Sequence, residues 1–131
     1  KRQKQDQAIL GDLSRIEKLE DYLKEMEKVA KEAFRVLKQG KYAGILIGDT
    51  RIHNHYVPLA YYVMRVFLKT GFILKEEIIK VQWNCRSTPL WRKKSVKRNF
   101  YLIMHEHLFV FRKPTYNENL RKFKYSTLMN I

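Results

Sequence analysis

The sequence contains a single cysteine and no long apolar run. Cys85 therefore cannot form an internal disulfide, and a cysteine-rich zinc site is excluded. Arg65 and Lys69 interrupt the best apolar stretch, so no membrane-spanning helix is expected. The first residues, KRQKQDQ, are polar and lack the pattern of a signal peptide. These absences predict a soluble protein in a reducing, cytoplasmic setting.

Acidic residues are also scarce, because the chain has 13 Asp and Glu against 27 Lys and Arg and a formal net charge of +14. This charge favours an acidic partner, above all nucleic acid, with an anionic membrane surface as the weaker alternative. The charge is uneven: residues 11–32 are nearly neutral, whereas only Glu106 and Glu118 are acidic after position 82. A phosphate-binding surface is therefore predicted in the last third of the chain.

The strongest local pattern is helical. Apolar residues recur at three- and four-residue steps and predict a helix from Ile16 to Gln39. Ser14 and Glu17 have the spacing of a capping box at its start, and Gly40 is a suitable left-handed stop at its end. A second helix is predicted between Pro58 and Gly71.

Three strands are predicted from short runs of apolar residues. Residues 42–48 (YAGILIG) are typical of a central strand that is buried on both faces. Residues 73–83 and 100–112 are rich in β-branched and aromatic residues, and a long basic loop is predicted between them at 84–98. The strand–helix–strand order predicts parallel pairing of the first two strands, with the last strand antiparallel.

The predicted fold class is therefore α/β, with an open sheet or half of one. A single domain is expected, with a lead-in at residues 1–14, an α/β core at 15–113 and a basic tail at 114–131 that has no assigned structure.

The segments RVLKQG (35–40), GD (48–49) and HEHLFVFRK (105–113), in this order and spacing, resemble the C-terminal half of amino-group DNA methyltransferases. These enzymes transfer a methyl group from S-adenosylmethionine to adenine N6 or cytosine N4. The resemblance covers residues 11–114 and implies a partial Rossmann-like methyltransferase sheet with flanking helices. Residues 42–48, 73–83 and 100–112 would be the last three strands, with the final one inserted antiparallel between the other two.

Two signatures of that family are absent from the chain. The catalytic one is an acidic or polar residue followed by two prolines and an aromatic residue, but Pro58, Pro89 and Pro114 are never adjacent. The glycines form no glycine-rich turn of the kind that lets a backbone approach the cofactor. We therefore expect a fragment, a split subunit or a degenerate copy that is inactive alone and does not bind S-adenosylmethionine tightly.

A missing N-terminal half, a second chain or a homodimer would then complete the sheet. Without such a partner, the strand at 42–48 would have one unpaired edge.

Asp49 follows the first predicted strand, at the end where open α/β sheets bind ligands. The resemblance places Asp49 and Arg51 near the substrate cleft, where an acid could orient a base amino group. The alternative is that Asp49 is a turn residue or a cap of the next helix.

Three residues alternate along the last predicted strand, with His105 and His107 on one face and Glu106 on the other. The resemblance implies that His105 and Glu106 help to form the wall of the target-base pocket. Core or edge positions are the alternative for both.

His53 and His55, together with Asp49, are potential metal ligands that lie close in sequence. No fourth ligand or supporting cysteine is evident, and a solvated loop explains the two histidines equally well. No metal site is predicted.

The predicted loop at 84–98 and the residue before it are the main candidates for DNA contact. Cations there can neutralise phosphates, and tryptophans can stack on a base; the candidates are Trp83, Arg86, Trp91, Arg92, Lys93, Lys94, Lys97 and Arg98. Flipped bases are commonly held between aromatic or apolar side chains. The alternative is a solvated basic loop with one tryptophan buried at its base.

The resemblance thus implies part of a site-specific DNA methyltransferase, with DNA as its partner. One alternative is an RNA methyltransferase of the same fold that acts on guanine N2. The other is a non-catalytic basic module that binds nucleic acid or an acidic protein, and such a module would have a closed, self-sufficient sheet.

Overall fold

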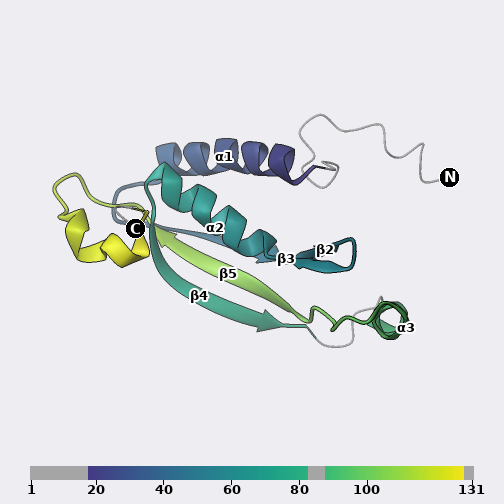
Figure 1. The fold of residues 1–131 in the computed structure, drawn as a ribbon. Coiled ribbons are helices and arrows are strands. Elements are labelled where there is room, and N and C mark those ends of the chain that lie inside the picture. The colour runs from purple at the N-terminus through teal and green to yellow at the C-terminus, as the bar shows by residue number, and fades with distance from the viewer. Residues whose placement is uncertain (1–17, 83–87, 129–131) are drawn as a thin grey trace.

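The computed structural model describes residues 18–82 and 88–128. Helices α1 (Leu19–Val36) and α2 (Leu59–Thr70) pack on one face of a sheet formed by β1 (Tyr42–Gly48), β4 (Ile73–Val81) and β5 (His105–Arg112) (Figure 1). The shorter elements are a hairpin of β2 (Thr50–Ile52) and β3 (His55–Val57), the helix α3 (Thr88–Arg98) and the 3-10 helix η2 (Leu120–Ser126). The fold is mixed α/β, as predicted. No helix in the described ranges is long and apolar enough to span a membrane.

The sheet order is β1-β5-β4, and β5 runs antiparallel to both neighbours. β1 and β4 are therefore parallel but share no hydrogen bonds, so the direct pairing expected from strand–helix–strand order is wrong. The insertion of the last strand between them, which the resemblance implied, is confirmed. His107 lies opposite Ile47 of β1 and opposite Ile79 of β4. Since paired residues share a face, this register decides which side chains meet.

The ends of α1 differ from the prediction. The helix begins at Leu19 after Lys18, which makes no side-chain capping bond, and the expected capping box at 14–17 lies outside the described residues. The helix ends because Leu37 turns to an extended backbone, with φ −73° and ψ 137°. Gly40 does adopt the left-handed conformation, with φ 71°, but three residues farther on. Its N–H donates to the carbonyl of Lys113 at 2.8 Å, so this turn joins β1 to the end of β5.

β1 was predicted to be buried on both faces, and this prediction is wrong. Ile47 is the only buried residue of the strand. Among the described residues, helices cover only one face of the sheet, and β1 pairs only with β5. The sequence of β1, YAGILIG, has glycine rather than polar residues at exposed or half-buried positions, so it lacks the apolar–polar alternation that is typical of an edge strand.

Residues 84–98 were predicted to form a loop, but Thr88–Arg98 form α3. Pro89 sits in the first turn, where its missing N–H costs nothing. None of the residues of α3 is buried, so the helix has no apolar stripe and its sequence shows no period. The predicted strand at 100–112 likewise begins only at His105. Just before this strand, the carbonyl of Met104 accepts a hydrogen bond from the N–H of Gln82 at 2.7 Å.

The tail beyond Pro114 packs against the rest of the domain. Arg112 of β5 donates to both carboxylate oxygens of Glu118, at 3.0 and 2.6 Å. Its guanidinium also lies 5.4 Å from the ring centre of Phe123 in η2. Leu128 packs against the hydrophobic core, so the segment that had no assigned structure contributes to the packing.

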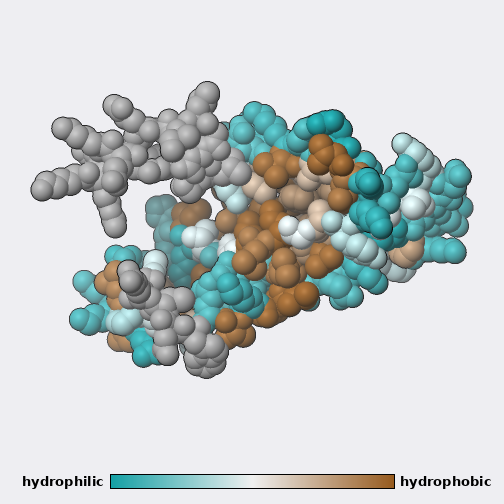
Figure 2. Space-filling model, turned by 180° about the vertical axis from the view of Figure 1, so that it is seen from behind, coloured by the Kyte–Doolittle hydropathy of each residue, from teal (hydrophilic) through white to brown (hydrophobic). Residues whose placement is uncertain are grey.

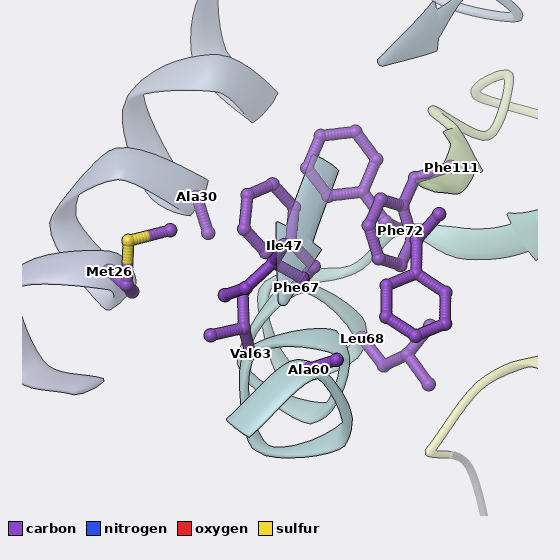
Figure 3. Packing of buried hydrophobic residues seen from close by; sticks show 10 residues of the cluster. Met26, Ala30, Ile47, Ala60, Val63, Phe67, Leu68, Phe72 and Phe111 are labelled. Atoms are coloured by element: carbon purple, nitrogen blue, oxygen red, sulfur yellow. The ribbon is translucent and has the colours of Figure 1, made fainter. Parts of the chain in front are cut away.

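The core lies between the two long helices and the sheet (Figure 3). Phe109 and Phe111 of β5 have no exposed surface, and Phe67 of α2 stacks on Phe111 with ring centres 4.9 Å apart. Phe72, just before β4, lies 5.7 Å from both Phe67 and Phe111. This packing fixes α2 against β5 and so positions the polar strand ends. Apolar surface nevertheless remains exposed, as the middle of Figure 2 shows.

Candidate functional site

A pocket of about 450 Å³ lies where β1 and β4 end and β5 begins. Its walls come from the turn after β1, the end of β4, α3 and the segment that leads into β5: residues 48–51, Gln82, Thr88, Trp91, Phe100 and residues 102–106. All the residues predicted at the substrate cleft line this pocket, namely Asp49, Arg51, His105 and Glu106. The carboxyl ends of parallel strands are where open α/β sheets bind ligands.

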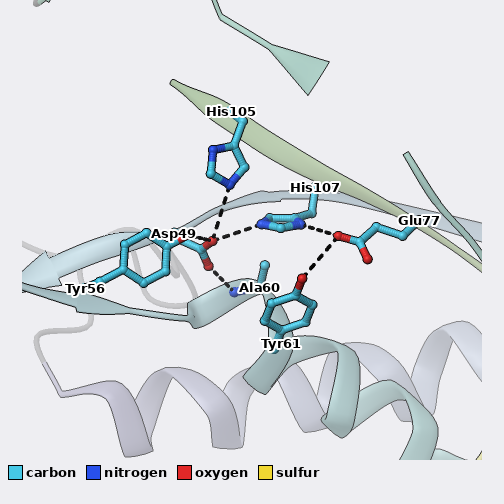
Figure 4. Close-up of polar contacts among 7 residues, drawn as sticks. All are labelled: Asp49, Tyr56, Ala60, Tyr61, Glu77, His105 and His107. Carbon is cyan, nitrogen blue, oxygen red and sulfur yellow. Dashed lines mark hydrogen bonds and ion pairs between the residues drawn. The ribbon is translucent and has the colours of Figure 1, made fainter. Parts of the chain in front are cut away.

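The Asp49 carboxylate has no exposed surface and is held by three groups (Figure 4). The backbone N–H of Ala60, in the first turn of α2, donates to Oδ1 at 2.9 Å. The Tyr56 hydroxyl and His107 Nε2 both donate to Oδ2, the imidazole from 2.9 Å. Pro58, at the N-cap of α2, makes no side-chain capping bond. Asp49 therefore caps α2 from the end of β1, as the structural alternative predicted.

His107 is buried between two carboxylates. Its Nε2 lies 2.9 Å from Asp49 Oδ2, and its Nδ1 lies 2.7 Å from Glu77 Oε1. A neutral imidazole donates through one nitrogen only, so donation to both carboxylates requires the imidazolium. Burial acts to lower the pKa of His107, but the hydrogen bonds to Glu77 and Asp49 outweigh it and raise the pKa. Burial likewise acts to raise the pKa of Asp49, and the bonds from Tyr56, Ala60 and His107 leave that pKa lowered.

His105 and Glu106 lie on opposite faces of β5, as the alternation predicted. His105 Nε2 is 4.0 Å from Asp49 Oδ2, and its side chain is 35% exposed. Glu106 accepts a hydrogen bond from the side-chain amide of Gln82 and lies 4.0 Å from the ammonium of Lys80. His105 thus belongs to the cluster around Asp49, whereas Glu106 belongs to a second polar group across the strand.

Arg51 connects the β2–β3 hairpin to the segment before β5. Its guanidinium donates to the carbonyls of Asn54 and Tyr101, at 3.3 and 2.5 Å. It also lies over the Phe100 ring, 4.3 Å from the ring centre, which is the range of a cation–π contact. Because these contacts already hold the guanidinium, Arg51 shapes the pocket wall.

α3 carries most of the residues predicted to contact DNA. The helix contains no acidic residue and includes Trp91, Arg92, Lys93, Lys94, Lys97 and Arg98. Trp91 lines the pocket, is 42% exposed and has its ring centre 6.4 Å from that of Phe100. Lys94 Nζ lies 4.8 Å from the Trp91 ring centre. Trp83 and Arg86, which were predicted to act with them, lie outside the described residues.

The two histidines weighed as metal ligands lie in the β2–β3 hairpin. His53 and Asn54 have positive φ angles of 50° and 63° and form its turn. His55 Nδ1 contacts the His53 carbonyl at 2.7 Å. Both histidines are exposed, and neither belongs to the group of converging ligand atoms found among the described residues.

Glu77, Tyr56 and Gln82 were not identified as site residues from the sequence. For His107 the sequence predicted only the face of the strand on which the side chain lies. Glu77 meets His107 through the register between β4 and β5, and Tyr56 reaches Asp49 through a hairpin of very short strands. The alternation of His105 and His107 was the one available signal. Cross-strand register is the information that the sequence pattern lacked.

The chain matches a known family over nearly its whole length. The DNA methylase family, N6_N4_Mtase, aligns with residues 4–130. The chain belongs to this family. The methyltransferase resemblance of its short motifs is therefore confirmed. No curated protein matches this chain.

Crystal structures of TTHA0409, a candidate DNA modification methylase from Thermus thermophilus, have a similar fold. The complex with S-adenosyl-L-methionine is 24% identical, with a TM-score of 0.59, over 90% of this chain and 48% of that protein. A second structure of the same protein is 23% identical, with a TM-score of 0.58, over 86% and 45% of the two chains. The present chain thus spans less than half the length of TTHA0409.

Proposed function

We propose that the chain is the distal half of a site-specific DNA methyltransferase that modifies adenine N6 or cytosine N4. The family match over residues 4–130 carries this proposal. The length of TTHA0409 and the outer edge of β1, which pairs with no strand among the described residues, both support an incomplete sheet. A self-sufficient basic module would close that edge, so the open edge favours the methyltransferase over this alternative.

S-adenosylmethionine is the expected methyl donor of the complete enzyme, but the described residues do not fit it. The expected cofactor signature is a glycine-rich turn, where the missing side chains let the backbone approach the ligand closely. A Cβ added at Gly44 or Gly48 would instead meet side chains of β5, Leu108 at 3.6 Å and Glu106 at 3.5 Å. Gly40 and Gly71 lie beside Thr115 and Phe34, in turns away from the pocket. We therefore expect the cofactor site to lie outside the described residues, in the proposed other half of the enzyme.

The pocket at the strand ends is the proposed site for the target base. Trp91 and Phe100 offer aromatic surface, and enzymes that act on bases in DNA hold the flipped base against such side chains. Glu106 is the carboxylate best placed to accept a hydrogen bond from the base amino group, since its side chain is 24% exposed. Asp49 is inaccessible, and both of its oxygens already accept hydrogen bonds.

The cations of α3 would hold the DNA backbone next to this pocket. α3 has no acidic residue and no buried side chain, so its lysines and arginines are all at least partly exposed to solvent. Such cations neutralise phosphates without reading the base sequence.

Binding of a short single-stranded oligonucleotide to the purified chain, measured by fluorescence anisotropy, tests the base pocket. Trp91→Ala should weaken binding at least about fivefold, because each base–aromatic stack contributes roughly 1–3 kcal/mol. Tyr116→Ala is the matched control, since Tyr116 is 90% exposed and does not line the pocket. An equal loss in both variants would contradict the proposal.

Two further measurements separate the remaining alternatives. Transfer RNA should compete less well than duplex DNA of equal length, whereas an RNA methyltransferase would show the reverse order. The chain alone should transfer no labelled methyl group to DNA, and robust transfer would show that its catalytic machinery is complete.

A further inference from the structure

Asp49, His105 and His107 each present one potential ligand atom, and these atoms lie within 4.8 Å of one another. His107 Nε2 is 2.9 Å from Asp49 Oδ2, and His105 Nε2 is 4.0 Å from the same oxygen. We propose that these three side chains bind a divalent transition-metal ion such as Zn²⁺. Two imidazole nitrogens and one carboxylate oxygen are a ligand set that zinc takes in proteins, with a further position left for water or another ligand.

The surroundings hold two of the ligands in the orientation that a metal requires. His107 Nδ1 lies 2.7 Å from Glu77 Oε1, so its N–H faces a carboxylate and Nε2 is directed toward the ion. Histidines that bind metals almost always donate their second N–H in this way, which fixes the tautomer and the ring orientation. Asp49 is fixed through its other oxygen, which accepts the Ala60 N–H at 2.9 Å. The ion would take the place of the proton that otherwise lies between Nε2 and Oδ2.

The third ligand makes the site accessible. His105 and Asp49 line the pocket of about 450 Å³, and the His105 side chain is 35% exposed whereas that of His107 is 5% exposed. An ion bound here would be buried on the helix side of β5 and would have its open position toward the pocket. The three ligands come from the end of β1 and from β5, which are joined by the register that places Gly48 opposite Glu106.

This inference does not depend on the proposed function, because it concerns metal binding alone. The test uses the 131-residue chain after treatment with a chelator, and it needs neither DNA nor S-adenosylmethionine. Zn²⁺ is titrated by calorimetry, and Co²⁺ is used as a spectroscopic probe of a low-symmetry nitrogen and oxygen site. One ion per chain is expected. Glu77→Gln should lower the affinity about 10- to 100-fold, because it removes the carboxylate that orients His107.

His105→Gln is the decisive variant, because His105 is partly exposed and is not a core residue. It should lower the Zn²⁺ affinity more than Glu77→Gln does, with the melting temperature of the metal-free chain unchanged. His53→Gln is the matched control, since it removes an exposed imidazole of the neighbouring hairpin and should leave the affinity unchanged. Absence of Zn²⁺ binding to the unmodified chain, or equal affinities of the His105→Gln variant and the unmodified chain, would refute the site.

Discussion

The backbone N–H of Ala60 donates to Asp49 Oδ1 at 2.9 Å, across 11 residues of sequence that include the β2–β3 hairpin. The start of α2 is therefore anchored to the end of β1 by a side chain that is distant from the helix in sequence. The same carboxylate holds Tyr56 and His107, so a single residue joins the strand, the hairpin, the helix and β5.

Asp49→Ala should lower the free energy of unfolding by at least about 1 kcal/mol, the usual cost of a lost helix cap. The loss should exceed that value because His107 also loses one of its two carboxylate partners. Urea denaturation monitored by circular dichroism measures the effect. Asp21→Ala, at an exposed position in the first turn of α1, is the control and should cost less. Equal losses would mean that the Asp49 contacts contribute little.

Lys93→Gln should weaken binding of duplex DNA and reduce the slope of log K against log salt concentration by about 0.9, the value for one phosphate contact. The reason is that α3 presents its cations next to the pocket. Anisotropy titrations at several salt concentrations measure the slope. Lys24→Gln removes the same charge from the exposed face of α1 and should leave the slope nearly unchanged. If the two variants give the same slope, α3 is not the phosphate-binding surface.

Gly71→Ala should destabilise the chain by about 1–3 kcal/mol, since a non-glycine residue is strained at this backbone conformation. Gly71 has a φ of 123°, and an added Cβ would lie 3.2 Å from the Phe34 ring. Gly44→Ala is the control, because its Cβ would meet Leu108 at an ordinary 3.6 Å. Thermal denaturation of both variants measures the difference, and a loss in Gly44→Ala as large as that in Gly71→Ala would contradict the explanation.

The pair of Arg112 and Glu118 should make stability depend on pH in the acid range. The hydrogen bonds from Arg112 hold the pKa of Glu118 below its ordinary value. A carboxylate with a lowered folded pKa stabilises the fold above its unfolded pKa, about 4.3, and this contribution is lost as the pH falls through the folded pKa. Glu118→Gln should therefore be less stable than the unmodified chain at pH 7, and the difference should disappear in strong acid.

Denaturation at pH 7 and in strong acid measures this dependence. Arg112→Lys supplies a second variant, since it keeps the charge but loses the two-pronged contact with the carboxylate. It should show a weaker form of the same dependence. A difference between the Glu118→Gln variant and the unmodified chain that is identical at both pH values would show that the ion pair does not contribute.

The order of the main elements could be predicted because its signals are local. The apolar stripe of α1 and the short apolar run of β1 each depend on neighbouring residues only. α3 could not be predicted, because none of its side chains is buried and a helix without an apolar face leaves no period. The hairpin was missed because β2 and β3 have three residues each, too few for an alternation.

The candidate site could be predicted only in part, for a different reason. Asp49 and His105 were found because one follows a strand and the other begins a motif. Glu77 was not found, since it meets His107 only through the register of β4 against β5, which includes an irregularity between Leu74 and Glu76. Side chains that meet through long-range pairing leave no pattern along a single segment.

The place of β5 in the sheet has a consequence for the order in which the chain folds. Tyr42 pairs with Arg112 and Ile73 pairs with the same residue, so both strand pairs of the main sheet among the described residues include β5, which follows β1 and β4 along the chain. β1 and β4 form no hydrogen bonds with each other, so they cannot pair before β5 is present. During synthesis, α1 and α2 can associate early, but β1 and β4 can be joined through hydrogen bonds only after β5 has left the ribosome. Folding of this region is therefore expected to be governed by the arrival of its last strand, as long-range pairings are slow to form.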